Sequence, residues 1–414
     1  MNKFNILNLF SPEEKSVSLI NNSQNSKPIW FKNLNGSQVA IVTAQIINNR
    51  SNNNLVVREN LEDALYFLDD LKNIAPNLSV SFFPSSERVK IGDNNVILER
   101  IEVLKKITSR KKTTIITYPK AIFEKPITKT EFKKNQLILK KGDIVNQEKI
   151  LDTFEHFGFK NTDFVFEPGD FTIRGCIIDV FSYGTDYPYR ILLDDEIIED
   201  ITCFKVSNQI SIENMNTAEI VSNIDNELNE NHTNLVTYLK EDTTIWLHNP
   251  KKIMGENQKI LKELIKKHVC IYTGNIVIEN YSKTITFDSS PQATFNKRFE
   301  LLINHLDEYK KLKYKNFITV SSENQMKRLN KIFKNYNHLI TLIDCGNSLK
   351  EGFVDHINKV LLYTDHQVFQ RHHQYKSKRF YKTENALSIQ DLTNLKKGDY
   401  ITHFDYGIGQ FDGL

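Results

Sequence analysis

At 414 residues the chain is longer than one hydrophobic core supports, so we expect three or more domains. Its 54 Lys and Arg residues face 51 Asp and Glu residues, and this near balance excludes the inference of a nucleic-acid partner from charge alone. No stretch approaches the roughly 20 apolar residues of a membrane span, and the start, MNKFNILNLFSPEEK, lacks the apolar core of a signal peptide. We therefore expect a soluble, cytoplasmic protein with no membrane partner.

The first part of the chain alternates in the manner of an α/β domain. After the apolar runs QVAIVTAQII and LVVREN, the segment LEDALYFLDDLKNI keeps its leucines on one helical face, which predicts a strand followed by a packed helix. The run VSFFP follows, Ile97, Ile101 and Leu104 mark a further helix, and TTIITYP reads as the next strand. This alternation predicts an α/β fold class.

After Leu137 the character of the sequence changes. LILKKGD, FVFEPGDFTIRGCIIDVF and YRILLDDEIIEDITCF are β-branched and aromatic runs separated by Gly-Asp and Tyr-Pro turns, which predicts a small β-rich insert.

A third alternating block opens near Thr294. It predicts a helix at FELLINHLDEYKKL, a strand at NFITVSS, a helix at ENQMKRLNKIFKNY, and strands at HLITLIDC and KVLLYTD. RHHQYKSKRFYK then predicts an extended surface connector, although its basic and aromatic residues also fit single-stranded nucleic acid. LKKGDYITHFDYGIGQFDGL predicts two strands of a barrel-like module, with Gly407 and Gly409 serving the turn.

Residues that would carry nucleotide or metal chemistry are few. A nucleotide-binding α/β domain needs a G-x-x-x-x-G-K-[ST] loop, and LNGSQVAIVT offers Gly36 and Ser37 without the second glycine or the lysine. We therefore expect no cofactor in this chain. The acidic run Asp194, Asp195, Glu196, Glu199 and Asp200 is predicted to be a solvated turn rather than a Mg²⁺ site, because neighbouring strand residues point to opposite faces.

The remaining metal-ligand residue types are also interpreted as structural. His366, His372 and His373 are predicted to belong to the connector region. The cysteines Cys176, Cys203, Cys270 and Cys345 form no C-x-x-C pair, so we expect small buried residues in a reducing compartment rather than zinc ligands or disulfides.

Three ordered segments resemble a known family. EPGDFTIRGCIIDVF, YPYRI and CFKVSNQIS resemble the insert domain shared by the excision-repair protein UvrB and the transcription-repair coupling factors (Mfd). The incomplete loop at Gly36 favours the coupling factors, whose first domain is a degenerate, nucleotide-free copy of that in UvrB. LLYTDHQVFQR and the last twenty residues resemble the end of that family's third domain and the start of its CarD-like, RNA-polymerase-interacting module.

The resemblance implies a domain organisation. Residues 1–125 and 211–290 would form a degenerate helicase-like (P-loop-type) α/β domain, interrupted by a UvrB-like, UvrA-interacting domain at 126–210. A small α/β domain at 291–372, a connector at 373–395 and the start of the CarD-like module at 396–414 would follow. In the family, ATP and Mg²⁺ are bound by helicase domains that follow this module, so we expect an N-terminal fragment or split gene product that is not itself an enzyme.

The resemblance also implies partners and a site. The family binds UvrA through this insert and brings nucleotide excision repair to RNA polymerase stalled at DNA damage. The corresponding interface residues are Arg174, Arg190 and, in place of a family Phe, Leu193 or Asp194. RNA polymerase would be a partner only if the chain continues past Leu414, and damaged or upstream DNA would be a partner of the full-length protein.

Other interpretations remain open at this point. Arg174 and Arg190 would instead solvate a sheet face or pair with Asp179 and Asp186. The chain would instead be a stand-alone CarD-like transcription regulator, or an ATP-dependent helicase or nuclease.

Overall fold

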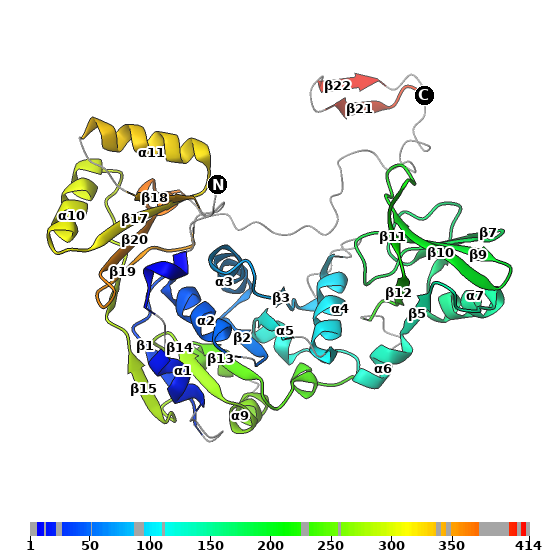
Figure 1. The fold of residues 1–414 in the computed structure, drawn as a ribbon, viewed down its shortest axis with the longest axis horizontal. Coiled ribbons are helices and arrows are strands. Elements are labelled where there is room, and N and C mark those ends of the chain that lie inside the picture. Colours follow the sequence, from blue (N-terminus) through cyan, green and yellow to red (C-terminus); the bar gives the residue numbers. More distant parts are fainter. Residues whose placement is uncertain are drawn as a thin grey trace. The chain divides into compact units, whose positions relative to one another are not determined.

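The computed structural model describes residues 6–11, 14–21, 27–50, 52–86, 95–109, 112–224, 232–255, 258–336, 341–344, 349–371, 397–403 and 407–410. It has several sheets with helices between their strands, so the predicted α/β multidomain class is confirmed (Figure 1). The chain divides into two compact units, Met1–Ser377 and Lys378–Leu414.

The first domain is built on a seven-stranded sheet in which every pairing is parallel. Its strands in spatial order are β15 (Lys283–Thr286), β1 (Ile29–Lys32), β14 (Cys270–Thr273), β13 (Thr244–His248), β2 (Asn54–Val57), β4 (Thr114–Thr117) and β3 (Val80–Phe82). Its helices are α1 (Glu14–Asn21), α2 (Gln38–Asn48), α3 (Leu61–Ile74), α4 (Asn95–Thr108), α5 (Pro119–Phe123), α6 (Lys129–Lys134), α8 (Pro250–Met254) and α9 (Gln258–Lys267), with 3₁₀ turns η1 (Ile6–Leu9) and η3 (Leu235–Tyr238).

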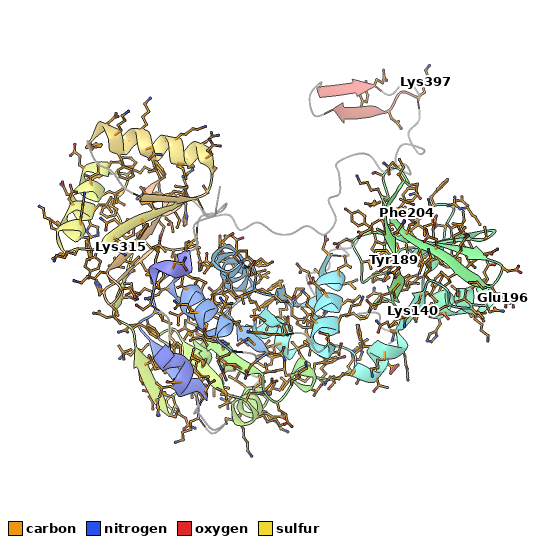
Figure 2. The ribbon with its side chains drawn as sticks, in the orientation of Figure 1. Lys140, Tyr189, Glu196, Phe204, Lys315 and Lys397 are labelled. Atoms are coloured by element: carbon orange, nitrogen blue, oxygen red, sulfur yellow. The ribbon has the colours of Figure 1, made fainter. Side chains whose placement is uncertain are left out.

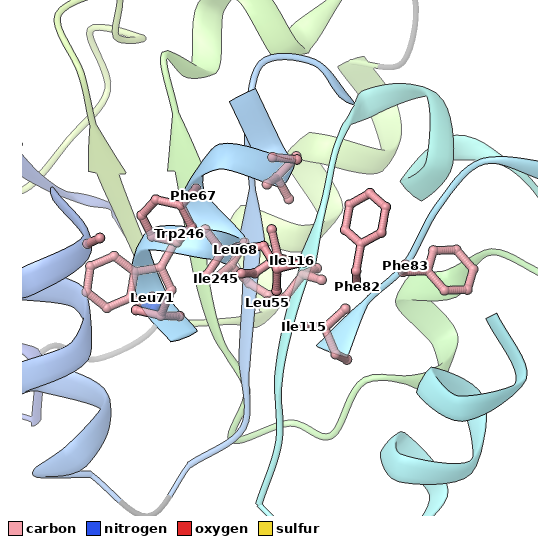
Figure 3. Close-up of a cluster of buried hydrophobic side chains, with 14 of the residues drawn as sticks. Leu55, Phe67, Leu68, Leu71, Phe82, Phe83, Ile115, Ile116, Ile245 and Trp246 are labelled. Carbon is pink, nitrogen blue, oxygen red and sulfur yellow. The ribbon is translucent and has the colours of Figure 1, made fainter. Parts of the chain in front are cut away.

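The core of this domain lies between helices and sheet. Figure 3 shows Phe67, Leu68 and Leu71 of α3 beside Leu55 of β2 and Trp246 of β13. The predicted helical stripe is thus confirmed as the buried face of α3, which begins at the N-cap Asn60. The run QVAIVTAQII is helix α2, and its residues from Gln38 to Ile47 are all buried, which explains why it has no polar face.

A β-rich insert interrupts the first domain, as predicted. Its main sheet has the order β11 (Ser211–Met215), β10 (Ile197–Phe204), β9 (Tyr189–Asp194), β8 (Ile177–Val180), β7 (Asp170–Arg174) and β6 (Lys160–Asn161), and α7 (Gln147–His156) packs on it. A separate antiparallel pair, β5 (Gln136–Lys140) and β12 (Thr217–Val221), joins it to the first domain. The strands of the insert thus extend past residue 210, where we placed its boundary.

The third domain is a small α/β unit. Its sheet has the order β16 (Ser289–Pro291), β19 (Phe353–Asp355), β20 (Val360–Thr364), β17 (Lys315–Val320) and β18 (Thr341–Asp344), with helices α10 (Phe299–Lys311), α11 (Glu323–Asn335) and α12 (Asp365–Val368). The two helices and three strands predicted from the sequence of this block are all confirmed.

The second unit contains one described hairpin, β21 (Tyr400–His403) paired with β22 (Gly407–Gln410). The two predicted strands are confirmed, but the role given to Gly407 and Gly409 is wrong. Both lie in β22, where Gly407 pairs with His403 and Gly409 pairs with Ile401.

The structure also bears on what the sequence predicted about membrane-spanning helices and about the cysteines. Within the described ranges, no helix combines the length and apolar character needed to cross a bilayer. Cys203 and Cys270 are buried as predicted, whereas Cys176 is exposed in the turn between β7 and β8, so that expectation is wrong for Cys176. Cys345 lies outside the described residues.

Candidate functional site: an arginine pair on the insert

The sheet of the insert has one core face and one outer face. Tyr189 and Ile191 of β9 point into the core with Phe171 and Ile178 of the neighbouring strands, and α7 covers them. Arg190 lies between these two core residues on β9 and therefore faces the opposite side. In Figure 2, Tyr189 and Phe204 mark one end of the paired strands β9 and β10, and Glu196 marks the turn at the other end.

Register brings three charged residues together on the outer face. Asp179 of β8 is the direct cross-strand neighbour of Arg190, and Arg174 follows two residues after Thr172, the neighbour of Asp179 on β7. Neighbouring strands are about 4.8 Å apart, so both guanidinium groups reach the same carboxylate.

Asp179 binds both arginines. Arg190 donates from Nε to Oδ1 over 2.8 Å and from Nη2 to Oδ2 over 2.9 Å, and Arg174 donates from Nη2 to Oδ2 over 2.8 Å. The Asp179 side chain is fully buried beneath them, while the side chains of Arg174 and Arg190 are 45% and 26% exposed. The alternative pairing with Asp179 is therefore found, but it holds the arginines at the surface rather than inside.

Each guanidinium also lies over an aromatic ring. The Cζ atom of Arg190 is 4.5 Å from the ring centre of buried Phe204, and that of Arg174 is 5.5 Å from the ring centre of Phe164. Nη1 of Arg190 donates to the backbone oxygen of Gln209 over 3.1 Å. Hydrogen bonding to Asp179 raises the pKa of Arg190 above its ordinary value, so this charge is permanent.

Arg174 is the more available of the two. It uses one nitrogen on Asp179, and nearly half of its side chain is exposed, whereas Arg190 uses three nitrogens within the fold. Two guanidinium groups sharing one carboxylate leave an excess of one positive charge. The arrangement suits recognition of a carboxylate on a partner, because guanidinium binds carboxylates through paired donors.

The resemblance implied that Leu193 lies at the interface, and the structure shows that this is wrong. It is buried in the core of the insert, while partly exposed Leu192 shares the outer face with Arg190. The pairing of β9 with β10 shifts between Ile198 and Asp200, opposite these two leucines. Asp194, the other residue considered for this position, is exposed at the hairpin turn.

The start of α2, where a nucleotide phosphate would bind, is in contact with the third domain. The N–H of Ser37 donates to the carbonyl oxygen of Glu351 over 3.0 Å, and the N–H of Glu351 donates to Oγ of Ser37 over 3.1 Å. Gly36 has a φ of +51°, and a Cβ added to it would lie 2.7 Å from the carbonyl oxygen of Gly352. The backbone of the third domain thus lies directly against the N-terminus of α2.

A cavity of about 500 Å³ lies beside this contact, and its lining is mixed in charge. Arg58 makes a two-point ion pair with Asp63, and Glu59 binds Lys252 over 2.7 Å. Burial, helped by the charge of Arg58, lowers the pKa of His248 to about 3, so this imidazole is neutral at physiological pH. The two cations of the lining, Arg58 and Lys350, thus both lie beside carboxylates of the same lining.

Comparisons with known proteins match the insert by itself and also larger parts of the chain. A family described as the UvrB interaction domain matches residues 137–225, which contain both arginines. The transcription-repair-coupling factor of Bacillus subtilis strain 168 is 19% identical over 519 aligned residues, covering 99% of this chain and 44% of that protein. This chain resembles the N-terminal region of a transcription-repair-coupling factor.

Other coupling factors match in part. The coupling factor of Staphylococcus epidermidis RP62A is 21% identical, and the alignment covers 87% of this chain and 40% of that protein. The coupling factor of Escherichia coli K12 is 19% identical, and the alignment covers 45% of this chain and 17% of that protein. The chain thus spans about two fifths of the length of the first two coupling factors. A chain from the crystal structure of a GtfA/B complex aligns over 65% of this chain and 61% of its own length, with 11% sequence identity and a TM-score of 0.12.

The other candidate residues, the acidic run and His366, take part in turns, ion pairs and hydrogen bonds within the fold. The acidic run from Asp194 to Glu196 forms the β9–β10 turn, where Asp195 has a φ of +56°, and Asp200 pairs with Lys141. The assignment of His366 to the connector region is wrong, because His366 is buried in α12 of the third domain, where its Nε2 is 2.7 Å from the carbonyl oxygen of Lys350. In the part of the chain that the structure describes, no three His, Cys, Asp or Glu side chains converge on a common metal position. His372, His373 and the connector after Arg371 lie outside the described residues.

Proposed function

We propose that this chain is the recruitment region of a coupling factor, and that it binds UvrA through the outer face of its insert. The observation that carries this proposal is the arginine pair held by Asp179 within the segment that matches the UvrB interaction domain. Its role would be to bring nucleotide excision repair to RNA polymerase stalled at DNA damage.

Preorganisation supports the assignment of Arg174 and Arg190 to the interface. An arginine loses side-chain entropy when it is fixed by a partner, and here Asp179 and the rings of Phe164 and Phe204 have already fixed both guanidinium groups. Arginine is also enriched among interface residues whose truncation costs more than about 2 kcal/mol.

The first domain is proposed to be a helicase-like fold that holds no nucleotide. The contacts of Ser37 with Glu351 and the closeness of Gly36 to Gly352 support this assignment. ATP and Mg²⁺ would be bound by helicase domains outside this chain. We assign 396–414 to the start of a CarD-like module, for which RNA polymerase would be a partner only if the chain continues past Leu414, and damaged or upstream DNA would be a partner of the full-length protein.

The test is a quantitative binding assay between the whole chain and UvrA. We expect the wild-type chain to bind, Arg174→Ala to weaken binding, and the double variant Arg174→Ala with Arg190→Ala to abolish it. Lys141→Ala is the matched control, because Lys141 is an exposed cation of the same insert that is paired with Asp200.

Circular dichroism and thermal melting would show that the variants remain folded. Binding that survives the double substitution would remove the assigned site, and a wild-type chain that does not bind UvrA would remove the function.

A further inference from the structure

Two loops flank the arginine pair and are tied to each other. Loop 162–166 lies beside Arg174, and loop 205–210 lies beside Arg190, whose Nη1 donates to the backbone oxygen of Gln209. Nε2 of Gln209 in turn donates to the backbone oxygen of Val165 over 3.4 Å. The two loops and the two arginines therefore belong to one surface.

Each loop presents one exposed apolar side chain. Phe164 is 49% exposed in the first loop, and Ile210 is 63% exposed in the second. Large apolar side chains with this much exposure beside a preorganised charge are typical of contact surfaces.

Local hydrogen bonds hold both positions. Oγ1 of Thr162 donates to the backbone oxygen of Phe164 over 2.9 Å, and the N–H of Lys205 donates to that of Ile210 over 3.0 Å. The N–H of Ile210 donates to Oδ1 of Asn208 over 3.1 Å. Because the loop backbones are fixed, binding would cost little further ordering of the chain.

The apolar part of this surface cannot come from Leu193, since that side chain is buried in the core. We propose that Phe164 and Ile210 supply it, one on each side of the arginine pair. This proposal rests on the function proposed above and specifies the partner surface, which presents a carboxylate to the arginines and apolar side chains to Phe164 and Ile210.

The charge of the surface favours a protein over a nucleic acid. Arg174 and Arg190 against Asp179 leave one positive charge, Lys205 in the second loop adds another, and Asp163 and Glu167 in or next to the first loop balance these two. A nucleic-acid surface requires several unpaired cations that neutralise successive phosphates. A protein with a mixed acidic and apolar patch, which is the chemistry we assign to UvrA here, fits better.

The experiment measures the affinity of the whole chain for UvrA at low and high salt. We expect Phe164→Ala to reduce affinity by about tenfold or more at both salt concentrations, because an apolar contact is not screened. The loss caused by Arg174→Ala should shrink as salt rises. Phe164→Leu should restore most of the affinity, and Ile210→Ala should reduce it.

Ile144→Ala is the matched control, because Ile144 is an exposed apolar residue in a different loop of the same insert, between β5 and α7. We expect it to leave the affinity unchanged. Thermal melting of each variant would confirm that the insert is folded.

The outcomes separate the two proposals. If wild type binds and the arginine variants lose binding while Phe164→Ala and Ile210→Ala do not, the apolar assignment is overturned and the proposed function stands. If wild type does not bind UvrA, both are overturned. If Phe164→Ala abolishes self-association of this chain and leaves UvrA binding intact, the surface belongs to a second copy and the proposal fails.

Discussion

The backbone N–H of Ser37 donates to the carbonyl oxygen of Glu351, joining the first turn of α2 in the first domain to the third domain. The hydroxyl of Ser37 binds Oδ2 of Asp70 over 2.6 Å, and the N–H of Lys350 binds Oδ1 of the same carboxyl over 2.8 Å. The buried Asp70 carboxyl therefore accepts hydrogen bonds from both domains and links two segments that are far apart in sequence.

Gly36→Ala should loosen this contact. The new Cβ would lie 2.7 Å and 2.9 Å from the carbonyl oxygens of Gly352 and Glu351, which are backbone atoms and cannot rotate away. We expect a loss of about 1–3 kcal/mol in unfolding free energy. Hydrogen exchange of the Ser37 and Glu351 amides should become faster. Gly175→Ala is the control.

Gly175 has a similar φ of +62° but nothing within 4 Å of an added Cβ. Its substitution measures the backbone cost alone, about 1–2 kcal/mol. Equal losses in the two variants, with unchanged exchange at Ser37, would contradict the proposed steric clash.

Asp70 should make stability depend on pH. Burial raises its pKa from 3.8 to about 7, although the hydrogen bonds from Ser37 and Lys350 act to lower it. At a pH between 3.8 and about 7, folded Asp70 holds a proton that the unfolded chain has released. The stability that this proton uptake contributes is therefore complete below pH 3.8 and is lost as the pH rises through about 7.

The variant Asp70→Asn keeps an acceptor but does not titrate. The difference in unfolding free energy between wild type and Asp70→Asn, measured by denaturant titration, should shift against the wild type from about pH 5 to about pH 8. A difference that stays constant over this range would show that Asp70 is ionised throughout.

Asp179→Asn should weaken both the insert and its binding surface. The change removes the charge that receives three hydrogen bonds from Arg174 and Arg190, each worth about 1.5–3 kcal/mol in other proteins, and we expect a net loss of about 2–3 kcal/mol. Affinity for UvrA should fall as well, because the guanidinium groups are no longer fixed.

Asp200→Asn is the control for Asp179→Asn, since Asp200 pairs with Lys141 at an exposed position and its loss should be much smaller. A melting temperature that changes equally in the two variants would argue that the buried carboxylate has no special role. Unchanged UvrA affinity in a destabilised Asp179→Asn chain would argue that the arginines need no preorganisation.

The sequence predicted features that depend on local periodicity. The apolar stripes of α10 and α11 and the alternation in β7 to β10 each repeat within one element, so the helices, strands and outward placement of Arg190 were predictable. The pairing of the arginines with Asp179 was one of the alternatives that the sequence left open, and the structure contains it.

Features that depend on exact register or on distant contacts were not predictable. Which residue stands in the place of the family Phe, Leu193 or Asp194, depends on a one-residue gap, and it is the alternation of β9 that puts Leu193 in the core with Tyr189 and Ile191. The contact between Ser37 and Glu351 joins loops with no pattern in common. Phe164 and Ile210 gave no signal, because an exposed aromatic or aliphatic residue in a loop looks like any other in a single sequence.

The antiparallel pair β5 and β12 has a consequence for how this architecture could change over time. Gln136 pairs with Val221, so the chain departs from the first domain and re-enters it through neighbouring backbone positions. A module whose two ends are adjacent can be removed, replaced or transplanted as a cassette without stretching its host. The docking function proposed for the insert is therefore separable in principle from the scaffold that carries it.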